Sequence, residues 1–246
     1  MKTLHNSLIL AVAIVTLALL VAAPAAYAGT MTCASGVCTQ TVIYGPEATN
    51  FSSVDLGSIS QFDTTLGTLN SVTIAFAGEI IGTIQFTNNG SSATDVSGYD
   101  IGTLNLTSGN ADLNALFPSA LIVSTNTVTV TNLAAGATGP IPAAAVSGSA
   151  VTAPVAVGSA DWYLFENAGG GSVDDLFLLS AIGSSTVSAG NGDGNAVYTT
   201  NAAGAATVTY DYGSGSPVPE PGTLSLFGTG LLGLAGVLRS RFSKAS

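Results

Sequence analysis

Basic side chains are almost missing from this sequence. Its 246 residues contain 14 Asp and Glu but four Lys and Arg, and no Lys or Arg occurs between residues 3 and 238. Proteins that bind nucleic acid neutralise phosphates with such side chains, so we exclude that class of partner. The single histidine is His5. The middle of the chain thus lacks the usual base for a Ser or Cys nucleophile, a Schiff-base lysine and a His metal ligand, so we expect no enzyme, cofactor or metal site.

Long hydrophobic runs are confined to the two ends of the chain, although the mean hydropathy is +0.53. Between them, short β-branched runs are separated by Gly, Asn, Asp and Ser, which is typical of an all-β globular domain. We therefore expect an antiparallel β-sandwich over residues 29–216. The expected strands are Thr41–Tyr44, Phe51–Leu56, Ser71–Ala77, Ile80–Thr87, Asp100–Leu106, Leu121–Leu133, Val151–Val157, Asp161–Glu166, Leu176–Ser188, Ala196–Thr200 and Ala206–Tyr212.

The connections between these strands carry their own predictions. Gly78-Glu79 indicates the turn of a hairpin, and the three prolines in residues 136–154 indicate a long connection. Residues 111–117 and 173–179 are each compatible with a single helical turn. Residues 191–195, Asn-Gly-Asp-Gly-Asn, superficially resemble a calcium loop, but Ala196 and Ala202 replace its Gly and its bidentate Glu. A hairpin turn between 186–189 and 196–200 explains that segment better.

Residues 1–28 have the pattern of a secretory signal peptide. Lys2 gives the positive start, Leu8–Val21 the apolar stretch, and Ala26 and Ala28 the small residues of a cleavage site before Gly29. The alternative is an N-terminal membrane anchor. Export would carry Cys33 and Cys38 into an oxidising compartment, so we expect them to form a disulfide. A redox or metal site is the weaker alternative, because the spacing is not Cys-x-x-Cys.

The C-terminal end, residues 217–246, combines three features in order. Pro217-Val218-Pro219-Glu220-Pro221 is extended, since alternating prolines prevent a helix. An apolar run at 223–238 follows, and then Arg239 and Arg241. The run is slightly shorter than the 17–25 residues of a comfortable membrane span. Basic residues prefer the cytoplasmic side, so we expect a single transmembrane segment with everything upstream outside the membrane.

These C-terminal residues resemble a PEP-CTERM sorting signal, through Val218-Pro219-Glu220-Pro221-Gly222-Thr223, the Gly-rich apolar run and the Arg-containing tail. The resemblance implies a protein of a Gram-negative bacterium that makes exopolysaccharide. It also implies recognition and processing by an exosortase, a membrane enzyme with a Cys nucleophile. The alternative is a plain C-terminal anchor that happens to contain Pro-Glu-Pro.

The middle of the chain resembles a second family, the choice-of-anchor E domain. The likeness lies in Gln61-Phe62-Asp63-Thr64-Thr65-Leu66-Gly67-Thr68-Leu69 before a Val-Thr strand, and in Thr207–Tyr212 as a last strand. It covers about residues 40–213. It implies an exported, all-β surface domain and brings no catalytic residues with it.

Carboxylates are the remaining reactive groups of the domain. Asp161, Glu166, Asp174 and Asp175 surround the single tryptophan, Trp162, and the rings of Trp162 and Tyr163 are of the kind that stacks on sugars. A glycoside hydrolase needs two opposed carboxyl groups, but solvated loop acids beside a core aromatic are the more economical interpretation. A carbohydrate-binding module is a better alternative than a hydrolase.

From the sequence we therefore expect a non-enzymatic structural or adhesive protein, transiently held in the inner membrane and then placed at the cell surface or in the extracellular matrix. Exopolysaccharide is one expected partner. Self-association is another, because edge strands are normally protected by lysine and this domain has none. Salt and calcium would screen the shared negative charge and promote it.

Overall fold

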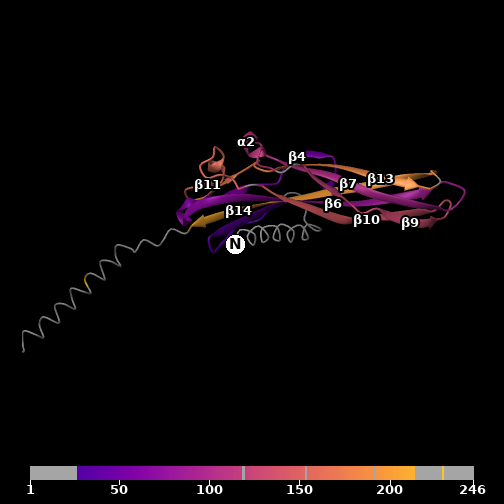
Figure 1. The fold of residues 1–246 in the computed structure, drawn as a ribbon, viewed down its shortest axis with the longest axis horizontal. Coiled ribbons are helices and arrows are strands. Elements are labelled where there is room, and N and C mark those ends of the chain that lie inside the picture. The colour runs from indigo at the N-terminus through magenta and orange to yellow at the C-terminus, as the bar shows by residue number, and fades with distance from the viewer. Residues whose placement is uncertain (1–26, 118–119, 153, 191, 214–228, 230–246) are drawn as a thin grey trace, which may run out of the picture.

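The computed structural model describes residues 27–117, 120–152, 154–190, 192–213 and Thr229. The domain is elongated, and its longest strands run along its long axis (Figure 1). The elements are β1 (Tyr27–Ala28), β2 (Thr32–Ala34), β3 (Val37–Ala48), β4 (Phe51–Asp55), β5 (Ile59–Asp63), a 3-10 turn (Thr64–Leu66), β6 (Thr68–Asn88), β7 (Thr94–Thr107), α2 (Ala111–Asn114), β8 (Leu121–Ser124), β9 (Val128–Leu133), β10 (Thr138–Val151), a second 3-10 turn (Trp162–Leu164), β11 (Glu166–Asn167), β12 (Gly171–Val173), β13 (Leu178–Ala189) and β14 (Gly194–Gly213).

The strands form two main sheets that pack face to face. The first has the order β1-β3-β14-β6-β10, with β2 also on β3, and the second has the order β4-β13-β7-β8, with β9 also on β7. All the pairings in both sheets are antiparallel. A small third sheet, β11-β5-β12, lies at one end. The expected all-β, antiparallel architecture is confirmed.

Strands β6 and β7 face each other across the two sheets through alternating small and large residues. On β6 the inward residues are Gly78, Ile80, Gly82 and Ile84, and the facing residues on β7 are Leu104, Gly102, Asp100 and Gly98. Each glycine lies against the large side chain opposite. A Cβ on Gly78 would be 2.9 Å from Leu104 Cδ2, and on Gly102 it would overlap Ile80. The two sheets therefore approach more closely than two full layers of side chains would allow.

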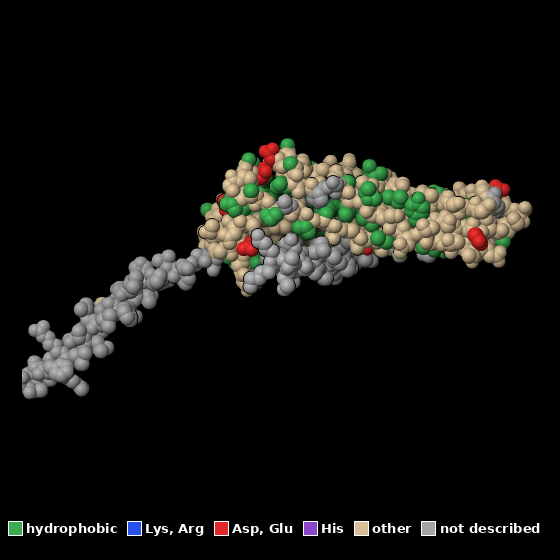
Figure 2. Space-filling model, in the orientation of Figure 1, with side chains coloured by type: hydrophobic (Ala, Val, Ile, Leu, Met, Phe, Trp, Pro, Cys, Tyr) green, Lys and Arg blue, Asp and Glu red, His purple; other side chains and the backbone are tan. Residues whose placement is uncertain are grey.

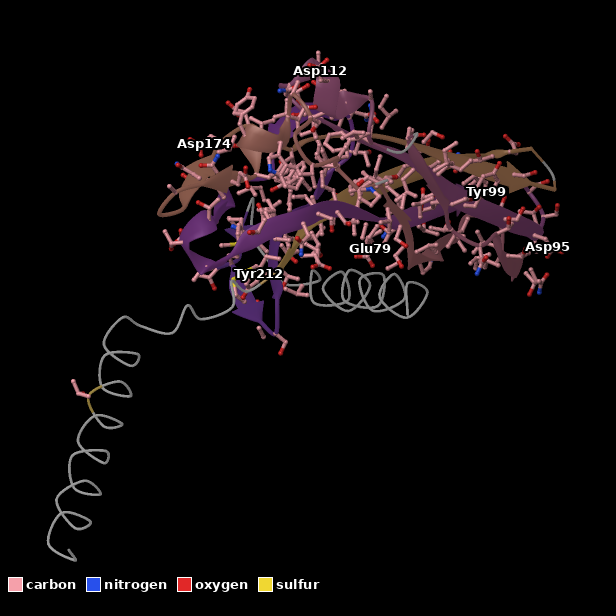
Figure 3. The ribbon with its side chains drawn as sticks, turned by 60° about the vertical axis from the view of Figure 1, so that its left-hand side comes forward. Glu79, Asp95, Tyr99, Asp112, Asp174 and Tyr212 are labelled. Carbon is pink, nitrogen blue, oxygen red and sulfur yellow. A yellow bond between two sulfur atoms is a disulfide. The ribbon has the colours of Figure 1, made fainter. Side chains whose placement is uncertain are left out.

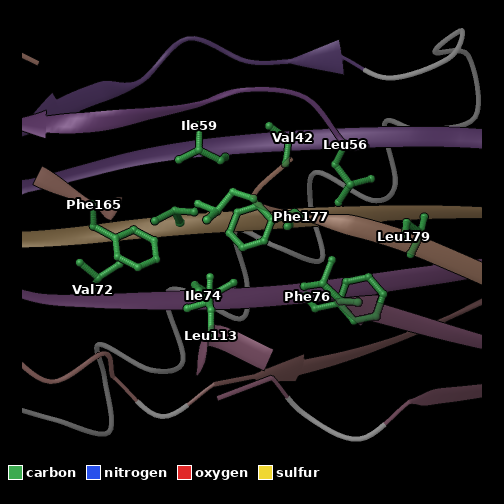
Figure 4. Packing of buried hydrophobic residues seen from close by; sticks show 14 of the residues in the cluster. Val42, Leu56, Ile59, Val72, Ile74, Phe76, Leu113, Phe165, Phe177 and Leu179 are labelled. Atoms are coloured by element: carbon green, nitrogen blue, oxygen red, sulfur yellow. The ribbon is translucent and has the colours of Figure 1, made fainter. Parts of the chain in front are cut away.

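The main hydrophobic core fills the end of the sandwich near the small third sheet. Its largest fully buried side chains include Tyr210, Phe62, Phe165 and Phe177. Figure 4 shows Phe165 and Phe177 among aliphatic residues of several strands. The Tyr210 hydroxyl donates a 2.7 Å hydrogen bond to the Ser60 carbonyl, and burial raises the pKa of this phenol. A second cluster, nearer the other end, contains Ile84, Phe86, Val96 and Ile141.

The predicted hairpin at Gly78-Glu79 is wrong. Strand β6 runs through both residues, and Gly78 pairs with Gly204 on one side and Gly148 on the other. A glycine is required at position 78 because Leu104 and Leu121 occupy the space where a side chain would lie. The glycine therefore permits close sheet packing instead of a turn.

Further local predictions need correction. The expected strand Leu121–Leu133 is two strands, β8 and β9, and Val151–Val157 is not a strand, since β10 ends at Val151 and Val155 forms an isolated bridge with Val72. The expected connection at 136–154 is largely strand β10, which tolerates Pro140 because it is an edge strand. Residues 161–166 form a 3-10 turn followed by β11, and 173–179 contain no helical turn. The helical turn within 111–117 is confirmed as α2, where the Asn110 side chain accepts hydrogen bonds from the backbone N–H groups of Asp112 and Leu113.

The predicted hairpin between 186–189 and 196–200 is wrong, because β13 and β14 do not pair with each other. Strand β13 belongs to one sheet and β14 to the other, so the chain crosses between layers at this point. The predicted signal peptide, except Tyr27 and Ala28, and the predicted span at 223–238, except Thr229, lie outside the described residues. Within the described part of the chain, no helix is sufficiently long and apolar to cross a membrane.

Candidate functional site

The end of the domain from which the C-terminal segment leaves is built around the predicted disulfide. Cys33 and Cys38 are bonded, with Cα atoms 4.0 Å apart, and join β2 to β3. The turn between them, Ser35-Gly36, has positive φ at both residues, as a tight two-residue hairpin requires. The N–H of Tyr212 donates to the Gly36 carbonyl at 2.8 Å, so the hairpin is fixed to the last strand. The predicted disulfide is confirmed.

Strand β14 ends beside this hairpin, at Gly213, which pairs with Thr68. The predicted sorting residues Pro219, Glu220, Pro221, Arg239 and Arg241 lie beyond it, outside the described residues. Five residues lie between Gly213 and Pro219. Fully extended, they span roughly 20 Å. An enzyme that acts at Pro-Glu-Pro must therefore work close to this end of the sandwich.

The predicted signal cleavage site lies at the start of the described chain. Ala26 is outside it, whereas Ala28 belongs to β1 and pairs with Val42 of β3. The N–H of Gly29 donates to the Thr41 carbonyl at 2.9 Å. Cleavage between Ala28 and Gly29 would remove both residues of β1 and leave that hydrogen bond in the mature chain.

The acidic residues around Trp162 do not form a stacking site with it. Trp162 is 7% exposed and belongs to the main core, whereas Tyr163 is 64% exposed. Asp161 is buried, and its Oδ1 has no hydrogen-bond partner among the described residues. Asp174 and Asp175 are exposed, and Figure 3 shows Asp174 far from Asp95 at the other end of the domain. The sugar-stacking role considered for Trp162 is therefore wrong.

A buried carboxylate that the sequence did not reveal lies between the sheets. Asp100 is fully buried on β7; its Oδ1 accepts hydrogen bonds from the hydroxyls of Ser185 and Thr200, the latter at 3.4 Å. Its Oδ2 faces Gly82 and has no partner among the described residues. Nothing in the local sequence distinguishes Asp100 from an exposed strand residue. The Ser and Thr partners come from β13 and β14, far along the chain.

Two hollows lie on the flank formed by β13 and β14, and Ser185 and Thr200 line the first of them. One, of about 370 Å³, is lined by Ala48, Thr49, Asn50, Gly183, Ser184, Ser185, Tyr198, Thr199 and Thr200. The other, of about 390 Å³, is lined by Phe86, Val187, Ser188, Ala189, Gly192, Gly194, Ala196 and Tyr198. We call residues 183–189 and 194–200, which contribute most of this lining, the β13–β14 furrow.

The furrow exists because its inward residues are small. Ser185 and Ala196 have short side chains, and the glycines admit neighbouring side chains, Thr49 beside Gly183 and the Phe86 ring beside Gly194. The opposite flank is filled by Val128, Val130, Leu133 and Ile141. Tyr198 belongs to both hollows and is 47% exposed. None of the residues lining the two hollows is charged. The two hollows can thus offer hydroxyl groups, the Asn50 amide, backbone groups and the rings of Tyr198 and Phe86, but no charged side chain.

No group of three or more His, Cys, Asp or Glu side chains suited to a metal ion occurs in the described ranges. Asp63 has a local structural role: its Oδ1 accepts hydrogen bonds from the N–H groups of Thr65, at 2.9 Å, and Gly169, at 3.0 Å. The hydrogen bonding from Thr65, with a smaller effect from Gly169, lowers the pKa of this carboxyl. Asp63 therefore caps the first 3-10 turn and ties it to the loop after β11.

Comparison with solved structures gives several structures of viruses and virus particles, all with low TM-scores. Infectious bursal disease virus VP2 subviral particle gives a TM-score of 0.18 at 12% identity, covering 75% of this chain and 40% of that chain. The structure of mud crab tombus-like virus gives a TM-score of 0.16 at 9% identity, and the alignment covers 77% of this chain and 88% of that chain. The chain thus spans less than half of the first of these proteins. Comparison with curated proteins gives no match.

The family comparison identifies the C-terminal segment. Residues 217–241 match the family described as the PEP-CTERM protein-sorting motif. The match contains Pro219, Glu220, Pro221, Arg239 and Arg241, and it follows the last strand of a domain that ends at Gly213. This chain therefore carries a PEP-CTERM sorting motif and is an exported, surface-directed protein of the kind that an exosortase processes.

Proposed function

We propose that this protein is a non-enzymatic structural or adhesive component of the cell surface or the extracellular matrix of a Gram-negative bacterium. A signal peptide, residues 1–28, starts its export, and a transmembrane segment at 223–238 holds it in the inner membrane until an exosortase acts near Pro219-Glu220-Pro221. The β-sandwich, which resembles a choice-of-anchor E domain, is the part delivered. The sorting motif at 217–241 is the observation that carries the proposal.

The composition of the delivered domain supports a structural role. Lys, Arg and His are absent from residues 6–238, so none of the side chains there can serve as a histidine base or a lysine nucleophile. Figure 2 shows the acidic side chains mostly toward the two ends of the elongated body, with uncharged surface between them. A neutral flank suits contact with other matrix components, exopolysaccharide among them.

Processing can be tested in a cell that has an exosortase. We expect mature protein that begins at Gly29 and lacks residues beyond about 222, as measured by intact mass. Glu220→Ala, or Arg239→Ser with Arg241→Ser, should leave a larger precursor in the inner membrane. Glu47→Ala, which changes an exposed glutamate of the domain, is the matched control and should be processed normally. Full-length wild-type protein that stays in the inner membrane would contradict the proposal.

A carbohydrate-binding module is the second candidate. The uncharged furrow with its hydroxyl groups and half-exposed Tyr198 favours it, since sugars bind to aromatic faces and neutral hydrogen-bonding groups. Retention of the purified domain on a neutral polysaccharide, lost in Tyr198→Ala and kept in Tyr163→Ala, would establish this function. Tyr163 is the control because it is an exposed tyrosine outside the furrow.

A further inference from the structure

Most edges of this sandwich carry features that prevent pairing with another strand. Strand β10 has Pro140 and an irregular register between Ala143 and Val146. Strands β1, β2, β4, β8 and β9 are two to six residues long, and β4 ends in Asp55. The end of β3 contains Pro46 and Glu47. Proline, short length, bulges and charge are the usual protection of an edge strand.

One flank has no proline, no bulge and no charge along its open edges. Strand β4 pairs with β13 only as far as Ala181, and β3 pairs with β14 only from Asn201. Residues 184–189 of β13 therefore pair only with β7, and residues 194–199 of β14 pair only with β6, among the described strands. Both stretches keep a regular register and contain no proline and no charged residue.

These two open edges belong to different sheets but lie on the same flank, because the hollows of the furrow are lined by both. An extended peptide could complete one sheet and would leave the other edge open. A second copy of this chain supplies two edges with the same spacing. A two-fold axis perpendicular to the sheets would pair β13 with its counterpart and β14 with its counterpart, both antiparallel.

We propose that the mature protein forms a two-fold symmetric dimer through the β13–β14 furrow, in which both sheets continue from one copy to the next. This deepens the structural role proposed above and rests on it. The contact is isologous, so it uses up the open edges of both copies. Since the other edges are protected, assembly stops at two copies instead of extending into a fibre.

The antiparallel pairing sets the direction of the two copies. Gly213 lies 16 residues from Val197, which is close to the middle of the open part of β14. At the rise of a β-strand this is roughly 50 Å, so the two Gly213 residues lie roughly 100 Å apart at opposite ends of the dimer. The C-terminal segments then leave in opposite directions. Such a dimer suits two copies that meet from facing surfaces or after release from the membrane.

Every strand pairing that the structure describes lies within residues 27–213, so the test uses a purified fragment of residues 27–216. Sedimentation velocity over a concentration series should show a monomer and a dimer and nothing larger. Thr186→Lys combined with Thr199→Lys puts a charge on each open edge at exposed positions. We expect this variant to raise the dimer dissociation constant at least tenfold. Thr129→Lys with Thr131→Lys adds the same charge on exposed positions of β9 and should leave it unchanged.

Disulfide cross-linking between the two copies can locate the two-fold axis of the dimer along β13. Ser184→Cys, Thr186→Cys and Ser188→Cys are introduced singly, and the native cysteines are already bonded to each other. Directly opposed residues of an antiparallel pair have Cα atoms about 4.5–5.5 Å apart, within disulfide range, so the position nearest the axis should cross-link to itself. Thr131→Cys should not. For labels at residue 213, pulsed electron paramagnetic resonance should give no short distance.

Several results would overturn the proposal. These are a fragment that stays monomeric up to its solubility limit, species larger than a dimer, loss of dimer in the β9 lysine variant only, or a short distance between labels at residue 213. Protection of Tyr198 by a neutral polysaccharide in a monomeric protein would make the furrow a saccharide site instead. None of these outcomes bears on export, because processing at Glu220 is measured separately in cells.

Discussion

The interlocking of β6 and β7 can be measured with one pair of residues. Ile80 of β6 fills the space above Gly102 of β7, and a methyl group on Gly102 would overlap the Ile80 side chain. Gly102→Ala should destabilise the domain by about 1–3 kcal/mol, the usual cost of overpacking. Ile80→Ala should cost about 2–5 kcal/mol, because it removes a fully buried aliphatic side chain and leaves a cavity.

The double variant, Ile80→Ala with Gly102→Ala, tests whether these two residues are in direct contact. With Ile80 shortened, the new methyl group on residue 102 enters the vacated space, so the two effects should fall short of their sum by about 1–3 kcal/mol. Urea unfolding at a constant m-value gives the four free energies of the cycle. Gly98→Ala is the control, since Gly98 faces Ile84. Its effect should add to that of Ile80→Ala within about 0.5 kcal/mol. Additive costs for Ile80 and Gly102 would refute the proposed close contact.

Two further changes have defined outcomes. Cys33→Ser with Cys38→Ser opens a loop of only a few residues, so the free energy of unfolding measured in urea should fall by at most about 1–3 kcal/mol. The circular dichroism spectrum should not change. Loss of the fold would show that the hairpin is essential. Tyr210→Phe removes the donor to the Ser60 carbonyl and should cost about 1–3 kcal/mol at neutral pH. Burial raises the Tyr210 pKa above its unfolded value of 10.0, so the folded wild type holds this proton longer than the unfolded chain and loses stability as the pH rises above 10. The Phe variant should lose less between neutral and alkaline pH, and an equal loss would contradict the assignment to Tyr210.

Alternation of apolar and polar residues was enough to predict the fold class. Most expected strands, such as Ser71–Ala77 and Ile80–Thr87, fall within strands of the structure. The strands of the structure are longer than these predictions, because glycine and proline occur inside them as well as at their ends. At Gly78 and Gly204 the glycine instead admits a leucine from the opposite sheet, and at Pro140 the proline lies on an unpaired edge. A propensity pattern cannot separate these tertiary causes from a turn.

Some of the candidate sites could be predicted from local sequence, and others depend on tertiary structure. The disulfide and the sorting motif depend on local sequence order, and both predictions are confirmed. The formation of the furrow and the burial of Asp100 depend on which strands become neighbours in the sheets, so no local sequence pattern predicts them. One readable signal was overlooked: glycine recurs at every fourth residue in Gly78, Gly82 and again in Gly98, Gly102. In a strand this spacing leaves alternate inward positions empty and predicts a partner with large residues in between.

The position of β14 has a mechanical consequence. This strand is the last before the sorting segment, and from Asn201 to Asp211 it lies between β3 and β6. It pairs with β6 from Gly194 to Gly213 and with β3 from Asn201 to Asp211. Tension applied to the C-terminal segment and resisted at the far end of the domain would load these hydrogen bonds in shear, all at once, because they lie perpendicular to the strand. A domain attached through β14 should therefore yield to pulling much more slowly than one attached through an edge strand that unzips pair by pair.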